Sequence, residues 1–161
     1  MFYIKLFCCD VMPTHFRGNA EQVRALNAFI KLARAADSFS SRVSRTISDA
    51  GLTENQFGVL EALLHLGPLQ QGELAKKRLR SAGNITMVID NLEKRGLVRR
   101  EPQAEDRRVN VVHLTDAGRE LITRIFPGHV HAVLREMGVL TPAEQDELGR
   151  LCRKLGKGLG T

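Results

Sequence analysis

Asp106, Arg107 and Arg108 form a tight cluster of opposite charges in front of an apolar, β-like run. A guanidinium group at a hairpin tip can enter the minor groove of DNA, where the negative potential is focused. A neighbouring carboxylate can hold such an arginine in place through a bidentate pair, and Asp106 is placed to do so. The alternative is an exposed ion pair worth about 0–1 kcal/mol. The cluster favours a DNA-contacting tip, with either arginine as the groove residue.

A second candidate site lies at the start of an amphipathic segment. A helix that enters the major groove needs small residues where its backbone approaches phosphates, and polar side chains that reach base edges. The alternative is an ordinary amphipathic helix with a polar outer face. Lys76 and Arg80, just before this segment, are candidate phosphate contacts. The candidate recognition residues are Ser81, Ala82, Gly83, Asn84, Thr86 and Met87.

Basic charge is concentrated around these two sites. The chain of 161 residues has a net charge of +6, and its hydrophobic content of 43% is typical of a folded globular protein. Residues 74–108 contain ten basic and five acidic residues, which leaves +5 of that net charge. A solvated surface would also account for such a run. Taken with the two candidate sites, the charge favours nucleic acid as the partner.

The N-terminal half is predicted to be helical. Apolar residues at steps of three or four predict one long helix over 19–48, capped by Asn19 and ended by Gly51. Thr53 and Gln56 form a capping box for a second helix, which Gly67 and Pro68 end. A short helix over 71–78 and a break at 79–81 follow. The next helix buries Ile85, Val88, Ile89 and Leu92, and Gly96 ends it.

Two strands and two helices complete the chain. Residues 97–101 and 109–114 predict strands of a hairpin with a long polar loop. Thr115 caps a helix that extends to about Met137, and Pro127 predicts a kink or break in it. The last helix has a capping box from Thr141 to Glu144. Its apolar residues are expected to face inward: Leu148, Leu151, Cys152 and Leu155.

This order of elements predicts a mainly α fold with a small β-hairpin wing (α+β). A winged helix-turn-helix core is flanked by long helices that are too apolar to stand alone, so they need each other or a second copy of the chain. We expect a poorly ordered leader over 1–18, an N-terminal dimerisation helix over 19–50 and a DNA-binding domain over 51–114. C-terminal helices over 115–161 complete the dimerisation domain.

Other chemistry has weaker signals. The chain has neither a phosphate-binding glycine loop nor a catalytic motif, so we expect neither an enzyme nor a cofactor or metal. Cys8, Cys9 and Cys152 are odd in number, which argues against a disulfide framework and favours the cytoplasm. Redox sensing by one of them stays open. No run is long enough to span a bilayer. The histidines are expected to serve surface or packing roles: His65, His113, His129 and His131.

Residues 84–118, "NITMVIDNLEKRGLVRREPQAEDRRVNVVHLTDAG", resemble the MarR family of bacterial winged-helix regulators. The most specific pieces are "DNLEKRGLVRR", the Asp-Arg-Arg cluster and "LTDAG", and a weaker likeness covers about 20–155. The resemblance implies homodimers with interlocking first and last helices. It also implies one recognition helix and one wing per protomer on a palindromic site. A small phenolic or acidic effector is a further partner that it implies.

The resemblance also assigns residues by position. Gly83, Asn84, Thr86 and Met87 match the base- and phosphate-facing positions, and many members have a larger residue, often Arg, in place of Met87. In the wing, Asp106 and Arg108 match the acid and the arginine, and Arg107 fills the variable place between them. We therefore expect a homodimeric, sequence-specific repressor that a small ligand releases from double-stranded DNA. The alternative is a helical protein-interaction module that docks on an acidic partner without a DNA site.

Overall fold

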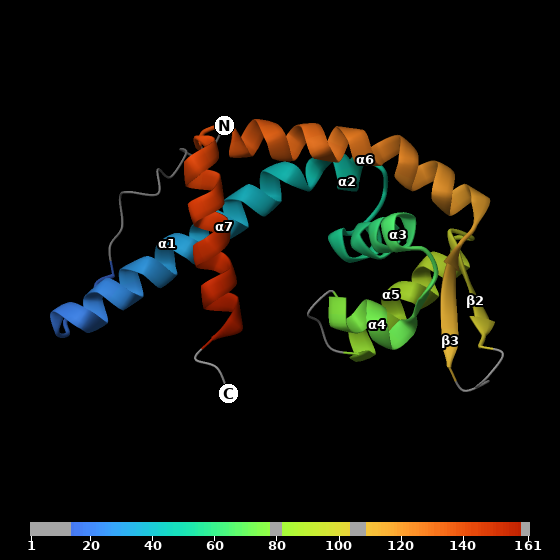
Figure 1. The fold of residues 1–161 in the computed structure, drawn as a ribbon, viewed down its shortest axis with the longest axis horizontal. Helices are drawn as coiled ribbons and strands as arrows, with labels where there is room; N and C mark the ends of the chain where they lie inside the picture. The colour runs from blue at the N-terminus through green and yellow to red at the C-terminus, as the bar shows by residue number, and fades with distance from the viewer. Residues whose placement is uncertain (1–13, 78–81, 104–108, 159–161) are drawn as a thin grey trace, which may run out of the picture. The chain divides into compact units, whose positions relative to one another are not determined.

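The chain forms seven helices and three short strands in the residues that the computed structural model describes, which are 14–77, 82–103 and 109–158 (Figure 1). It divides into two compact units, Met1–Arg42 and Val43–Thr161. The helices are α1 (Ala20–Val43), α2 (Arg45–Asp49), α3 (Glu54–Leu66), α4 (Gln71–Lys77), α5 (Ala82–Lys94), α6 (Asp116–Met137) and α7 (Pro142–Lys157). The strands are β1 (Leu69–Gln70), β2 (Val98–Pro102) and β3 (Asn110–Leu114).

The long first helix begins as predicted but ends early. Asn19 caps it, since its Oδ1 accepts a hydrogen bond from the Gln22 backbone N–H at 2.9 Å. The prediction of one helix over 19–48 is wrong, because α1 ends at Val43 and the separate helix α2 follows. The carbonyl of Ser44 accepts from the backbone N–H groups of both Ile47 and Ser48. Ser44 keeps helical backbone angles, with φ −74° and ψ −7°, and its side chain makes no cap hydrogen bond, so no capping side chain explains the interruption.

One apolar core organises the second unit. The fully buried side chains come from α3, α4, α5, the sheet and α6, and α5 turns its predicted stripe inward. Figure 1 shows α3 between α6 and the α4–α5 pair. Thr53 and Gln56 make the predicted capping box at the start of α3. The largest fully buried side chains are Leu60, Leu63, Leu74, Ile89, Leu92 and Ile122.

The sheet has one strand more than the predicted hairpin. Its order is β1-β3-β2, and all neighbours are antiparallel. Val98 pairs with Leu114 and Pro102 with Asn110, so β2 and β3 form the hairpin at nearly the predicted bounds. The two residues of β1 pair with Val112 and Val111. A strand of two residues is too short to show a period-2 pattern, so periodicity does not predict it.

The end of α5, the base of the hairpin and the start of α6 pack closely together. Gly96 has a φ of 68°, and this left-handed conformation ends α5 and starts the return into β2. The Thr115 hydroxyl donates to the Gly96 carbonyl at 2.6 Å and accepts from the Gly118 backbone N–H at 3.0 Å. Gly118 lies directly against the Leu97 carbonyl, where a Cβ atom would overlap. The "LTDAG" motif thus caps α6 and closes the hairpin at its base.

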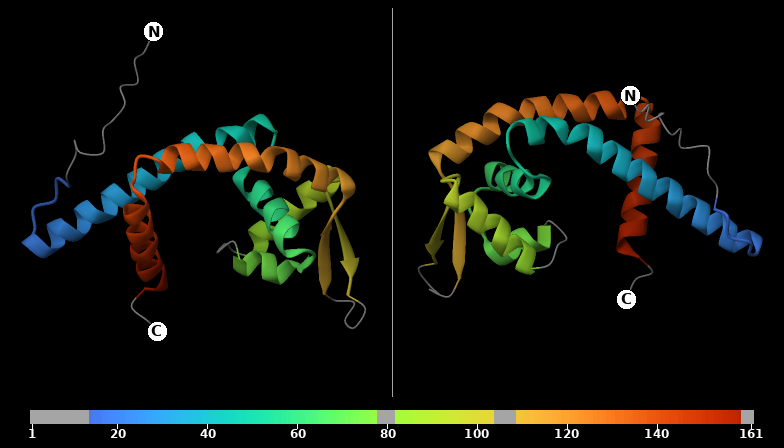
Figure 2. Two further views of the ribbon diagram at one scale, coloured as in Figure 1. Left: turned by 45° about the horizontal axis from the view of Figure 1, so that its top comes forward. Right: turned by 180° about the vertical axis from the view of Figure 1, so that it is seen from behind.

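α6 runs unbroken through Pro127, so the predicted break is absent. Figures 1 and 2 show α6 as one gently curved helix. Proline removes a hydrogen bond to the carbonyl four residues earlier, which is that of Thr123. Both residues lie on the exposed side of α6, where water can hydrate that carbonyl.

α7 is capped as predicted but does not bury its apolar face in the single chain. Thr141 and Glu144 form the capping box with Pro142 at the first turn. The pKa of Glu144 is lowered mainly by the hydrogen bond from the Thr141 backbone N–H and, to a smaller extent, by the hydrogen bond from the Thr141 hydroxyl. The prediction that Leu148, Leu151, Cys152 and Leu155 face inward is wrong for one chain, since no residue of α7 is buried. Leu155 is 64% exposed.

The packing around Gly118 makes a stability prediction. Gly118→Ala places a methyl group against the Leu97 backbone, and we expect a loss of roughly 1–3 kcal/mol in the free energy of unfolding. Gly128→Ala in the same helix is the control, because no neighbouring atom lies near its Cβ position. The control should be neutral or up to about 1 kcal/mol more stable. Urea denaturation followed by circular dichroism measures both, and equal stabilities would contradict the packing of Gly118.

Candidate nucleic-acid interface

α4 and α5 form a helix-turn-helix pair. The pair is held by Leu74, Ala75 and Ile85, which are all buried between the two helices and the rest of the core. α4 is only seven residues long, and this packing compensates for its low intrinsic stability. Residues 78–81 lie outside the described residues, so Arg80 and Ser81 are not placed. The described part of the pair nonetheless has the order expected of a recognition unit.

The outer face of α5 is free to contact a ligand. Met87 is 60% exposed, and Thr86 and Asn91 are exposed beside it. Ile85, Val88, Ile89 and Leu92 are buried, as the sequence predicted, so the opposite face must point to solvent. Ala82, Gly83 and Asn84 form the first turn of α5. Of the predicted recognition residues, Thr86 and Met87 therefore lie on the exposed face of α5, while Ser81 lies outside the described residues.

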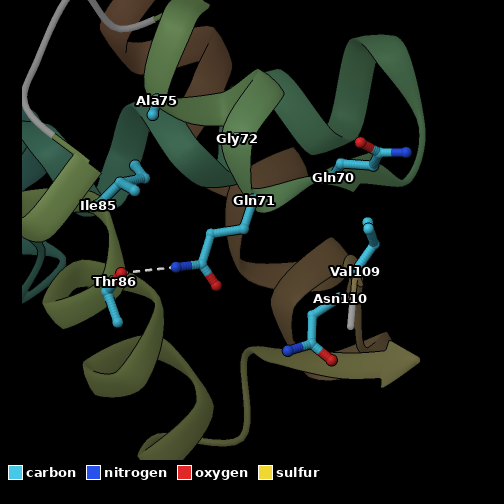
Figure 3. Close-up of a pocket in the computed structure, with 8 residues that line it drawn as sticks. All are labelled: Gln70, Gln71, Gly72, Ala75, Ile85, Thr86, Val109 and Asn110. Atoms are coloured by element: carbon cyan, nitrogen blue, oxygen red, sulfur yellow. Dashed lines mark hydrogen bonds between the residues drawn. The ribbon is translucent and has the colours of Figure 1, made fainter. Parts of the chain in front are cut away.

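A groove of about 450 Å³ lies beside this face, lined by residues of α4, α5, β1 and the start of β3 (Figure 3). The Gln71 side-chain amide crosses it and donates to Thr86 Oγ1 at 2.6 Å. Asn110 lies on the sheet side of the groove. Amide groups such as these donate readily to phosphate oxygens and base edges. The lining residues are Gln70, Gln71, Gly72, Ala75, Ile85, Thr86, Val109 and Asn110.

The groove contains residues that the sequence analysis missed. Periodicity predicts Gln71 only as part of a short helix and Asn110 only as part of a strand. Gln70 also donates through its side-chain amide to the Gln103 side-chain oxygen at 3.0 Å, a link across the middle strand of the sheet. The sequence offers only the adjacent amides Gln70 and Gln71 and, far along the chain, Asn110 between two valines, and only folding brings these residues together.

Of the basic residues predicted to contact DNA, the structure describes only Lys76. Lys76 is exposed on α4, as a phosphate contact requires. Arg95 is also exposed, and it donates to the Gly51 carbonyl at 2.8 Å, which ties the end of α5 to the loop before α3. Asp106, Arg107 and Arg108 lie outside the described residues. The hairpin that carries them is closed by a bond from the Gln103 backbone N–H to the Val109 carbonyl at 2.9 Å.

The histidines and cysteines form no second site in the described part of the chain. His129 packs on Phe57 with ring centroids 4.6 Å apart, and His65 packs on Phe126 at 4.9 Å. His113 Nε2 lies 3.3 Å from Glu101 Oε2 at the sheet surface. The His, Cys, Asp and Glu residues described here form no metal-binding group of three or more. Cys152 is exposed and free, while Cys8 and Cys9 are outside the described residues.

A helix-turn-helix with an exposed recognition face, a flanking groove and a hairpin defines a winged-helix DNA-binding regulator. The profile of the MarR family matches residues 50–109. The chain is 38% identical over 139 residues to the uncharacterized HTH-type transcriptional regulator YkoM of Bacillus subtilis. The aligned region covers 86% of this chain and 90% of that protein. The chain belongs to the MarR family, and it is a DNA-binding transcription regulator.

Two solved structures support this identification. Sco3205, a MarR family regulator from Streptomyces coelicolor solved in complex with DNA, is 31% identical with a TM-score of 0.80, over 90% of this chain and 92% of that one. BpsR of Bordetella bronchiseptica, whose DNA binding is regulated by 6-hydroxynicotinic acid, is 28% identical with a TM-score of 0.74, over 91% and 99%. The described helices include none that is long and apolar enough to cross a bilayer.

The two faces of α5 predict opposite responses to truncation. Met87→Ala should change the free energy of unfolding by less than about 0.5 kcal/mol, because the Met87 side chain is largely exposed. Ile89→Ala, two residues along the same helix, should cost roughly 2–5 kcal/mol because Ile89 is fully buried. Chemical denaturation of both variants measures this. A large loss for Met87→Ala would mean that Met87 belongs to the core and is not available for DNA.

Proposed function

We propose that the protein is a homodimeric repressor that binds a palindromic operator and is released by a small ligand. The observation that carries this proposal is the outer face of α5, where Thr86 and Met87 are exposed beside a groove that presents the amide side chains of Gln71 and Asn110. A face of this kind suits the major groove, where polar side chains read base edges and a methionine can contact a thymine methyl group. The DNA complex of the similar regulator Sco3205 supports the same use.

Each part of the DNA-binding surface has a separate task in this proposal. Gly83 and Asn84, with Ser81 and Ala82 before them, let the start of α5 approach the DNA backbone, and Thr86 and Met87 read bases. Lys76 and Arg80 contact phosphates, which contributes affinity without sequence information. In the wing, Asp106 orients Arg108 toward the minor groove, with Arg107 beside it.

The dimer is proposed from apolar surface that one chain leaves exposed. Leu148, Leu151 and Leu155 repeat at steps of three and four on α7 and are 39%, 48% and 64% exposed. Leu134 at the end of α6 is 62% exposed. A second copy of the chain would cover such a stripe, and a two-fold axis would then present two recognition helices to a palindrome. The N-terminal helix α1, with Phe29 66% exposed, is the second proposed dimer element.

The ligand response is proposed from the similar regulator BpsR, whose DNA binding responds to 6-hydroxynicotinic acid. A small aromatic or acidic compound of this class is the effector that we propose here. We also propose that the protein acts in the cytoplasm, where its DNA partner is, and that it has no catalytic role. Relatives that are transcription regulators support the last point.

Operator binding tests the proposed function directly. We expect the purified dimer to shift DNA from the region upstream of its own gene, with a strong preference over random DNA of equal length. Affinity should fall steeply with salt, because Lys and Arg contacts to phosphates release counterions. Gel shifts at several salt concentrations measure both properties. A protein that captures an acidic protein partner but shows no sequence preference at low salt would instead support the interaction-module alternative.

The wing makes a more specific prediction. Arg108→Ala should weaken operator binding by roughly 1–3 kcal/mol per half-site, because it removes the proposed groove arginine. Arg107→Ala is the matched control, with the same charge change one residue away, and should have a smaller effect. Fluorescence anisotropy with the selected operator measures both variants. The reverse order of effects would assign the groove role to Arg107.

A further inference from the structure

An arginine of the hairpin contacts two acidic side chains of α5. Arg100 of β2 lies with its side chain only 19% exposed. Its Nη1 donates to Glu93 Oε2 at 2.7 Å and its Nη2 donates to Asp90 Oδ1 at 2.5 Å. The Arg100 backbone N–H also donates to Glu93 Oε1 at 2.9 Å, so both Glu93 oxygens bind one residue of the strand. We call Asp90, Glu93 and Arg100 the Arg100 clamp.

Arginine suits this place better than any other side chain. Asp90 and Glu93 are three residues apart on α5, so their carboxylates lie on the same side of the helix and repel each other. The planar guanidinium group donates in two directions at once and can satisfy both carboxylates. The carboxylates are 45% and 39% exposed, beside a surface that has to attract phosphates. Arg100 offsets their charge at that surface.

The same contacts extend to α4. Arg100 Nη2 approaches the Thr86 carbonyl oxygen at 3.5 Å, and the Thr86 hydroxyl accepts a hydrogen bond from the Gln71 side-chain amide at 2.6 Å. Arg100 therefore connects with the recognition residue Thr86, and Thr86 connects with the first residue of α4. Figure 3 shows the Gln71–Thr86 part of this link at the wall of the groove. One polar chain thus joins β2, α5 and α4 on the side where DNA is proposed to bind.

We propose that Arg100 is a positioning residue for sequence recognition. It holds β2 against α5, so that the wing and the recognition helix reach their two DNA grooves at one fixed spacing. This inference rests on the proposed operator binding. A free wing would lose conformational entropy on docking, and the clamp removes that cost before DNA arrives. Random DNA makes mostly backbone contacts, which depend less on the angle between helix and wing, so the clamp favours the operator specifically.

Arg99 provides a matched control on the same strand. Because side chains alternate along a strand, Arg99 lies on the opposite face of β2 from Arg100. Its Nε donates to Glu101 Oε1 at 3.0 Å, and both side chains are 51% exposed. Arg99→Gln and Arg100→Gln therefore make the same charge change one residue apart. Only the second of them opens the clamp.

The first experiment compares operator and random DNA for the wild type, Arg100→Gln and Arg99→Gln by fluorescence anisotropy at one salt concentration. We expect Arg100→Gln to lower the ratio of operator affinity to random-DNA affinity about tenfold, within the usual coupling range of residues in contact. Arg99→Gln should lower it less than about twofold. Equal effects of both variants on both DNAs would overturn the proposal, because charge alone would then account for them.

A charge-conserving variant separates positioning from neutralisation. Arg100→Lys keeps the positive charge, but a single ammonium group does not reproduce the planar contact to two carboxylates. We expect its affinity to keep the wild-type dependence on salt while its selectivity falls. Wild-type selectivity in Arg100→Lys would contradict the positioning role.

The second experiment needs no DNA. Hydrogen exchange of the free protein should be faster in β2 and β3 of Arg100→Gln than in Arg99→Gln, with the protection of α3 unchanged in both. Equal exchange of β2 and β3 in the two variants would overturn the clamp. A wild type without operator preference would instead overturn the proposed function, and hydrogen exchange would still decide whether Arg100 fixes the wing.

Discussion

The burial of one face of α5 is the constraint on which the DNA-binding unit depends. Ile89 and Leu92 are fully buried, and they pack with the side chains of α3, α4, the sheet and α6 in one core. Since a helix with one face in the core must turn the other outward, this packing alone decides that Met87 is exposed. The direction of the face that we propose to read DNA is therefore set by apolar residues on the opposite side of the helix.

Polar contacts then fix what the core leaves free. The core sets which way α5 faces, but an apolar contact has little direction, and the hairpin could pivot about it. Hydrogen bonds and ion pairs, which are directional, hold the hairpin at two places. Thr115 binds Gly96 and Gly118 where α6 starts, and Arg100 binds α5 through Asp90 and Glu93. At the groove, the hydrogen bond from Gln71 to Thr86 links α4 to α5 in the same directional way.

Local signals in the sequence were sufficient for most of the secondary structure. The capping boxes at Thr53 and Thr141 involve residues three apart, so their chemistry is complete within one turn of the chain. The buried face of α5 was predicted equally well, because its apolar residues repeat with the helical period. The predictions were wrong where contacts with other parts of the fold outweighed the local preference of the residues. Ser44 divides a helix whose apolar period continues across it, β1 exists only because β3 lies beside it, and Pro127 is tolerated because its side of α6 is exposed.

The sequence by itself determined the helix-turn-helix and wing, the face of α5 that is buried and the basic character of the region, because these depend on periodicity, caps and charge along the chain. Only the tertiary structure decided the partners of Arg100, the groove around Gln71 and Asn110, and the need for glycine at 118. Each of these depends on residues from separate elements that meet in space. Spacing along a chain carries no record of such distances, since they are set by how the elements pack.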